Sequence, residues 1–223
     1  IIGNALDGMM LNVSGGAALD VQLDKATITD QFSRDGINTT VTDAASIATF
    51  DILNSTISEN SDSGFVLNIL NGADAEAAFR FASIRNNGLY GIQTNVTGIG
   101  STLDISVDSN SQVTNHDLDG VEINASDFAL ITNAEFSGQL NTNLGDGLEI
   151  NLDTNARIDN LLLNESASLS TNFSNGLDLN MDNADVTTLI ISSNNSRNQE
   201  SGNSLTLLNG STIDNFSYFG FSD

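Results

Sequence analysis

Eight glycines recur along this chain at nearly even steps, and their spacing constrains the fold more than any other feature. They are Gly8, Gly36, Gly64, Gly91, Gly120, Gly147, Gly176 and Gly202. Behind seven of them, apolar or Thr residues alternate with polar ones, as in Gly64–Ile69 and Gly147–Leu152. The chain is therefore one structural unit written eight times with a period of roughly 28 residues, which is typical of a repeat protein.

The unit is built from strands, because its apolar stretches are short, alternate with polar residues and are cut by Gly, Asn, Asp and Ser. In the unit that begins at Gly176, the first strand follows the glycine and a second apolar group contains Val186, Leu189 and Ile191. A third short strand is predicted at Thr56–Asn60, Ser83–Asn86, Gln112–Asn115 and Ser168–Asn172. Three stacked strands per unit predict an all-β parallel β-helix of about eight coils, with residues 1–223 forming a single domain.

An Asn occupies the fourth position after most of these glycines. The column reads Asn12, Asn68, Asn95, Asn124, Asn151 and Asn180, with Thr40 and Thr206 in two coils. We interpret this position as a corner between strands, because Asn tolerates the left-handed backbone that a corner needs. Its amide both donates and accepts, so stacked Asn side chains can bond from coil to coil.

With its glycine period and Asn column, the unit resembles the coil of right-handed parallel β-helix proteins of the pectin-lyase-like group. The resemblance extends from Gly8 to about Leu207 and implies a right-handed solenoid with an Asn ladder at a tight corner. Members of that group include polysaccharide lyases and hydrolases, phage tailspikes and bacterial adhesins, so the fold leaves the activity open. The chain is most similar to the non-catalytic bacterial surface and adhesin segments.

The charge of the chain limits its partners. It carries 29 acidic and 6 basic residues, a formal net charge of −23, and no Cys, Pro or Trp. Such a surface disfavours nucleic acid and anionic membranes, and no apolar run is long enough to span a bilayer. The chain begins Ile1-Ile2 without Met, which favours a mature or excised segment of a secreted or cell-surface protein.

The two ends of the predicted solenoid differ in composition. Aromatic residues gather in Phe216–Phe221, which either folds over the last coil as a cap or fills its core. No comparable segment precedes the first coil. Because uncovered coils expose unpaired strand edges, we expect head-to-tail self-association or flanking repeats of a longer chain, with surface carbohydrate as a further partner.

Acidic residues recur at the second position after the glycine, where side chains should face outward. Glu122, Glu149 and Asp178 occupy it in three successive coils, and Gln93 precedes them. Carboxylates on adjacent coils would lie about 5 Å apart, a spacing that suits a retaining glycosidase or a bound cation. The alternative is a solvated acidic face without catalysis. We favour that alternative, because no basic residue for a lyase reaction is evident near the row.

Calcium is the cofactor that the acidic positions suggest, with Asp117, Asp119, Glu122, Asp146 and Glu149 as candidate ligands. The glycine-rich nonapeptide of calcium-binding β-rolls is missing from the sequence. The single histidine, His116, lies between two Asp residues and could serve as a general base or a metal ligand. We expect instead that it is a surface residue in a turn.

Together these features predict a structural or adhesive module, a stalk or fibre segment of a secreted or cell-surface bacterial protein. The alternative function is a polysaccharide-active enzyme, a hydrolase or lyase, that uses Glu122, Glu149 and Asp178 on one face.

Overall fold

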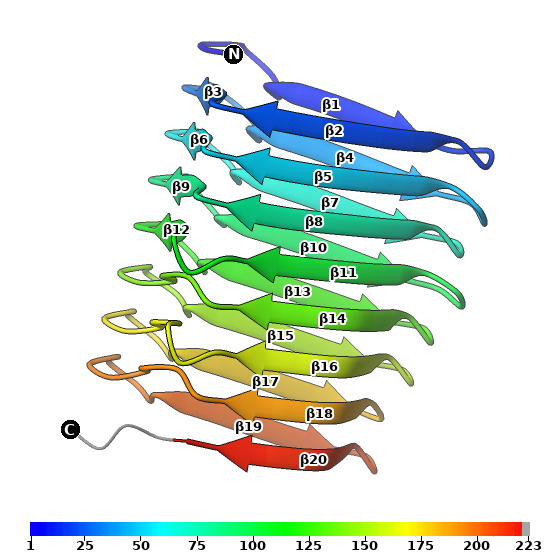
Figure 1. The fold of residues 1–223 in the computed structure, drawn as a ribbon, viewed down its shortest axis with the longest axis vertical. Coiled ribbons are helices and arrows are strands. Elements are labelled where there is room, and N and C mark those ends of the chain that lie inside the picture. The colour runs from blue at the N-terminus through cyan, green and yellow to red at the C-terminus, as the bar shows by residue number, and fades with distance from the viewer. Residues whose placement is uncertain (220–223) are drawn as a thin grey trace.

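Each glycine-led unit folds into one coil of a parallel β-helix in the computed structural model, which describes residues 1–219 (Figure 1). Its strands form three parallel sheets that run the length of the rod or part of it. Viewed from the N-terminal end, successive strands pass clockwise from one sheet to the next while the chain moves away, so the solenoid is right-handed. The chain is thus a right-handed parallel β-helix repeat protein, and the predicted fold class is confirmed.

The strands of each sheet come from successive coils. Sheet 1 contains β1 (Met9–Val13), β4 (Ile37–Thr42), β7 (Phe65–Leu70), β10 (Ile92–Thr97), β13 (Val121–Ser126), β15 (Leu148–Asp153), β17 (Leu177–Asp182) and β19 (Asn203–Leu208). Sheet 2 contains β2 (Ala18–Asp24), β5 (Ile47–Leu53), β8 (Asp74–Arg80), β11 (Thr102–Val107), β14 (Leu130–Phe136), β16 (Arg157–Leu163), β18 (Asp185–Ile191) and β20 (Thr212–Tyr218). Sheet 3 contains β3 (Thr27–Thr29), β6 (Thr56–Ser58), β9 (Ser83–Arg85) and β12 (Gln112–Thr114).

The core is a continuous apolar column between sheets 1 and 2. Strand pairing places equivalent residues of neighbouring coils in register, so Phe65 pairs with Ile92 and Ile92 with Val121, all fully buried. Phe65 also packs edge-to-face between Phe50 and Phe79, with ring centroids 5.3 and 5.2 Å away. Because every coil buries its inward residues against the next, the apolar positions of the repeat define the fold.

The predicted corner at the fourth position is wrong, although the predicted Asn ladder exists. Asn68, Asn95 and Asn124 lie in mid-strand on the outer face of sheet 1, half-buried between two inward neighbours. Simple two-residue alternation along a strand produces this pattern, so no turn is needed. The Nδ2 of Asn95 donates to Oδ1 of Asn68 at 2.9 Å, and Nδ2 of Asn124 donates to Oδ1 of Asn95 at 3.1 Å.

The prediction of a third strand in every coil is only partly correct. Within residues 1–219, sheet 3 has four strands, and its predicted continuation at Ser168–Asn172 is reduced to isolated bridges. Gln139, Ser168 and Asn194 make those bridges one residue at a time. The third side of the later coils is therefore mostly irregular, and its side chains and loop lengths vary.

The actual corner lies after the third side and carries a second, interior ladder. Its members are Gln31, Asn60, Asn87, His116, Asn143, Asn172 and Asn198, and each follows a residue with positive φ. The backbone N–H of Asn143 donates to Oδ1 of Asn172 at 3.0 Å, and other members repeat this bond between coils.

This interior ladder explains the glycine period. A Cβ on Gly120 would lie 2.7 Å from the Nδ2 of Asn143 and 2.7 Å from the carbonyl oxygen of Gly147. Most of the other repeat glycines face the same two kinds of atom at similar distances. Glycine is therefore required by close approach between coils, and not by its backbone angles.

The last coil leaves core positions uncovered among the described residues. Leu205 pairs with the buried Leu179, and Phe216 pairs with the buried Leu189, but they are 37% and 54% exposed. Of the predicted aromatic cap, Phe216–Tyr218 belongs to β20 and so continues the coil, whereas residues 220 and 221 lie outside the described residues. Among residues 1–219, no helix is both long enough and apolar enough to cross a membrane.

Candidate functional site

The predicted acidic row forms on the outer face of sheet 1. Gln93 pairs with Glu122, Glu122 with Glu149, and Glu149 with Asp178 in the parallel register of β10, β13, β15 and β17. The structure therefore brings together the three residues that the sequence proposed for catalysis. Glu122 is 8% exposed, and its Oε2 accepts a 2.6 Å hydrogen bond from Nε2 of Gln93.

A second acidic column lies beside this row, at the residue before the repeat glycine, which is Asp in four of the eight coils. Oδ1 of Asp119 accepts the backbone N–H of Asp146 at 2.5 Å, and Oδ1 of Asp146 accepts the backbone N–H of Asn175. In an earlier coil, Oδ1 of Asp35 accepts the N–H of Ser63 at 2.9 Å. These carboxylates thus have a structural role, because each satisfies a buried donor of the next coil.

The two columns meet in one compact cluster of Asp119, Asp146 and Glu149. One carboxylate oxygen from each lies within 4.8 Å of the others, a set that could hold a cation or share a proton. Of the other predicted calcium ligands, Asp117 is exposed and outside this cluster, and Glu122 is bonded to Gln93. Calcium binding stays a prediction for the three clustered residues.

The environment of the cluster favours protonated carboxyl groups. Burial raises the pKa of Asp119 to about 8, against the lowering effect of the Asp146 N–H, and the nearby Glu149 raises it further. Burial likewise raises the pKa of Asp146, and the N–H of Asn175 opposes the shift. At neutral pH Asp119 therefore holds a proton that it could donate, as the general acid of an acid–base pair does.

Tyr90 borders the cluster, since it occupies the same position before its glycine as Asp119. Burial and the charges of Glu122, Asp119 and Glu149 raise the pKa of its phenol to about 12. The phenol therefore keeps its proton at neutral pH and can donate a hydrogen bond. Sequence reasoning missed Tyr90, although its alignment with the Asp column was readable from the repeat.

The expected surface position of His116 is wrong. His116 is 1% exposed and replaces Asn in the interior ladder of the corner. Its Nδ1 accepts the backbone N–H of Asn87 at 3.2 Å, so Nε2 carries the proton and donates to the carbonyl oxygen of Ile84, also at 3.2 Å. Burial lowers the pKa of the imidazole to about 4, which leaves a neutral structural side chain and not a surface base.

The ion pairs of two arginines lie on sheet 2, on the other side of the coil from the acidic row. Arg80 pairs with Asp51 through a bidentate contact, and Arg157 pairs with Asp159. Both pairs join residues of sheet 2 strands. These guanidinium groups therefore neutralise carboxylates away from the candidate site.

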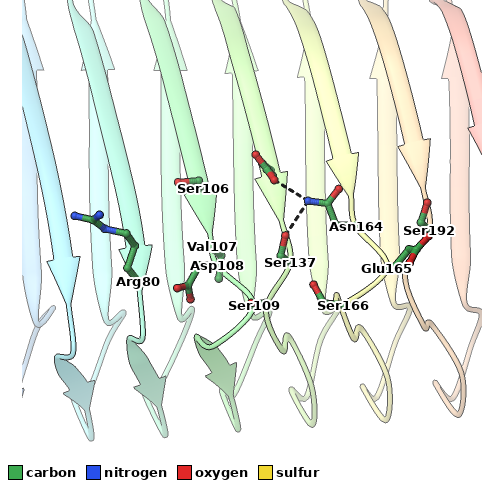
Figure 2. Close-up of a pocket in the computed structure, with 11 residues that line it drawn as sticks. Arg80, Ser106, Val107, Asp108, Ser109, Ser137, Asn164, Glu165, Ser166 and Ser192 are labelled. Atoms are coloured by element: carbon green, nitrogen blue, oxygen red, sulfur yellow. Dashed lines mark hydrogen bonds between the residues drawn. The ribbon is translucent and has the colours of Figure 1, made fainter.

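Sequence reasoning also missed a polar hollow at the carboxyl ends of the sheet 2 strands (Figure 2). It has a volume of about 820 Å³ and lies where the connections to the third side differ in length between coils. The differences were readable from the sequence once the coils were aligned.

The chain was compared with known families, curated proteins and solved structures. No protein family matches the chain, and no curated protein matches it significantly in sequence. A solved structure, the A-module of the mannuronan C-5 epimerase AlgE6 of Azotobacter vinelandii, is similar over 95% of this chain, with a TM-score of 0.43 and 12% identity. The chain spans 56% of the length of that structure.

Proposed function

We propose that the chain is a rigid structural or adhesive module of a secreted or cell-surface bacterial protein. The observation that carries the proposal is the continuous strand pairing of sheets 1 and 2, each with eight strands paired from coil to coil, with a register shift at Leu103–Asp104 of β11. Two side-chain ladders run beside these sheets along the same axis. A rod of this kind holds its outer faces at fixed spacing, which suits a spacer or a multivalent contact surface.

End-to-end association is part of the proposal. The uncovered Leu205 and Phe216 continue the core columns, and the outer edges of β19 and β20 offer backbone groups to a further coil. That coil would belong to a second copy or to flanking repeats. Pairing at such an edge would bury apolar surface and satisfy backbone donors together.

Electron microscopy of the purified chain, with and without calcium, tests this proposal. Straight rods or end-to-end fibres are expected, and surface display of the chain should increase binding of the host cell to polysaccharide-coated surfaces. Replacing Leu205 and Phe216 by Ser should abolish fibres and leave single rods intact. Flexible or collapsed particles would contradict the rigid module, and failure to increase binding would remove the adhesive role.

A second candidate function is a polysaccharide-active enzyme that uses the acidic face. The observation in its favour is the raised pKa of Asp119, which keeps a proton donor within 4.8 Å of the carboxyl oxygens of Asp146 and Glu149. In this reading the row of Glu122, Glu149 and Asp178 would contact the sugar chain. The bonds from Asp119 and Asp146 to backbone N–H groups also account for the cluster structurally, so we rank this function second.

A polysaccharide cleavage screen separates the two functions. The wild type is compared with the triple variant Glu122→Gln, Glu149→Gln, Asp178→Asn, whose uncharged side chains keep the shape of the face. Product release that the triple variant loses would replace the structural proposal with the enzyme. Equal absence of products from both chains would rule out cleavage of the polysaccharides tested.

A further inference from the structure

Alternating loop lengths create a notch at the carboxyl ends of the sheet 2 strands. After β11 and β16, the connections to the third side contain four residues, Asp108–Ser111 and Asn164–Ala167. After β14, the connection between them contains only Ser137 and Gly138. Each long connection is a closed turn, since N–H of Ser111 donates to the Asp108 carbonyl and N–H of Ala167 to the Asn164 carbonyl. Two projecting turns thus flank one short connection.

The short connection is held at the base of the notch. A Cβ on Gly138 would lie 2.7 Å from the carbonyl oxygens of both Asp108 and Ser111, so this glycine lets the coil pack directly against the preceding turn. The side chain of Asn164 crosses from the next coil, and its Nδ2 donates to Glu135 at 2.7 Å and to Ser137 at 2.8 Å (Figure 2). The floor is therefore a bonded unit before any ligand arrives, which reduces the entropic cost of binding.

The notch presents hydroxyl, amide and carboxylate groups from four successive coils and the guanidinium group of Arg80 from the coil before them. Its charged and amide side chains are those of Arg80, Asp108, Glu135, Asn164 and Glu165. Its volume of about 820 Å³ falls within the ~300–1,000 Å³ of small-molecule sites. Five of the lining residues are serines, whose hydroxyl groups each donate and accept hydrogen bonds.

The charge of the lining selects among ligand classes. Three carboxylates, those of Asp108, Glu135 and Glu165, face a single cation, and that cation, Arg80, already forms a bidentate pair with Asp51. Anionic ligands such as phosphates or uronic acids would therefore be repelled. A mainly apolar ligand would leave the serine and amide groups without partners.

We propose that this notch binds a short stretch of uncharged oligosaccharide. The hydroxyl groups of a neutral sugar both donate and accept, so they match serine hydroxyls, the carbonyl oxygen of Asn164 and the carboxylates without adding charge. The notch lies on sheet 2 and the acidic row on sheet 1, so the proposal goes beyond the structural role and stands without it. It assigns the chain a carbohydrate-binding site defined by loop length.

The test is a titration of the isotopically labelled chain, followed by backbone amide NMR shifts. The probes are cellohexaose, mannohexaose and laminarihexaose, with spermine as a cationic control. At least one hexasaccharide should bind with a Kd of about 1 mM or tighter. Its shifts should be centred on Asp108–Ser111, Ser137–Gly138 and Asn164–Ala167. Binding should persist in ~0.5 M NaCl, since no charge pair is involved.

A loop-shortened variant supplies the matched comparison. Asn164–Ala167 is replaced by the two-residue connection of the following coil, Ser192-Ser193, which that coil shows to be compatible with the fold. This variant should bind the sugar at least about tenfold more weakly, because it loses one wall and the Asn164 amide. The variant Asp153→Asn, which changes an exposed side chain of β15 on the other sheet, should bind like the wild type.

Any one of three results with the sugars would overturn the proposal. They are no shift with any of the three hexasaccharides at ~10 mM, shifts centred outside the notch, or unchanged binding by a loop-shortened variant whose circular dichroism spectrum matches the wild type. Salt-sensitive binding of spermine alone would likewise reject the neutral sugar in favour of an amine site. Because these readouts require neither rods, fibres nor cleavage, the notch proposal can fail while the rigid structural module stands.

Discussion

Replacing His116 by Asn should remove a pH dependence of stability that the wild type has below neutral pH. The imidazole is buried and neutral, and burial lowers its pKa from 6.5 to about 4. Between these values an unfolded chain binds a proton that the folded chain excludes, so wild-type stability falls as the pH falls. At about 1.36 kcal/mol for each pH unit, the loss amounts to about 3 kcal/mol by pH 4.

Asn is a suitable replacement because it occupies the same ladder position in the adjacent coils. Its Oδ1 can accept the N–H of Asn87 and its Nδ2 can donate to the carbonyl of Ile84, as the imidazole does. The smaller side chain leaves a cavity, which should cost about 1–2 kcal/mol at pH 7. The wild type should therefore be more stable than the variant at pH 7. This difference should shrink as the pH falls, and the variant should be the more stable chain near pH 4.

The assay is urea unfolding followed by far-ultraviolet circular dichroism at several pH values between 4 and 7. Buried carboxyl groups with raised pKa values also contribute to the pH dependence, because they make the folded chain more stable as the pH falls. Both chains contain these groups, so their contribution cancels in the difference between the two chains. Equal urea dependence of the two chains is the control, because it shows that both expose the same surface on unfolding. Parallel loss of stability in both chains would refute a neutral, buried imidazole.

Four further changes test other parts of the structure. Gly120→Ala should lower the free energy of unfolding by about 2–4 kcal/mol through its 2.7 Å clashes, whereas Gly15→Ala, with nothing within 4 Å and only a positive φ, should cost about 1 kcal/mol. Phe65→Ala should cost about 3–5 kcal/mol in urea unfolding by opening the aromatic core. Asn124→Asp should lower the Tm at pH 7 more than at pH 4, because an ionised carboxylate cannot donate to the next Asn of the ladder. Calcium should raise the wild-type Tm more than that of Asp119→Asn, and an equal response would remove the predicted ligand.

The fold was predictable because each coil repeats the same local rule. The glycine period, the apolar alternation and the Asn column fixed the number of coils and the pairing of neighbouring strands. Reading Asn68 and its equivalents as a corner failed because a polar residue between two apolar ones also fits a straight strand with one outward side chain. The prediction of a third strand is wrong for the coils after β12, because the sequence of this side varies with the length of the loop before it.

The sequence predicted which residues of the candidate site stack on one another, but not their protonation or their neighbours. Spacing placed Glu122, Glu149 and Asp178 in one row, since equal periods stack equal positions. The spacing could not show that the carboxyl group of Asp119 lies close to that row or that Tyr90 lies beside it. Both positions depend on the backbone path of the loop before the glycine.

The sequence by itself determined the repeat, the all-β class, the stacked outer row and the strongly negative surface, because these follow from periodicity and composition. Only the tertiary structure decided which Asn ladder lies at the corner of the coil and that His116 is buried in that ladder. It also decided that three carboxyl groups form one cluster and that connections of unequal length leave a notch. Those features arise between coils, where the position of an atom depends on side chains some 28 residues away and not on its neighbours in the chain.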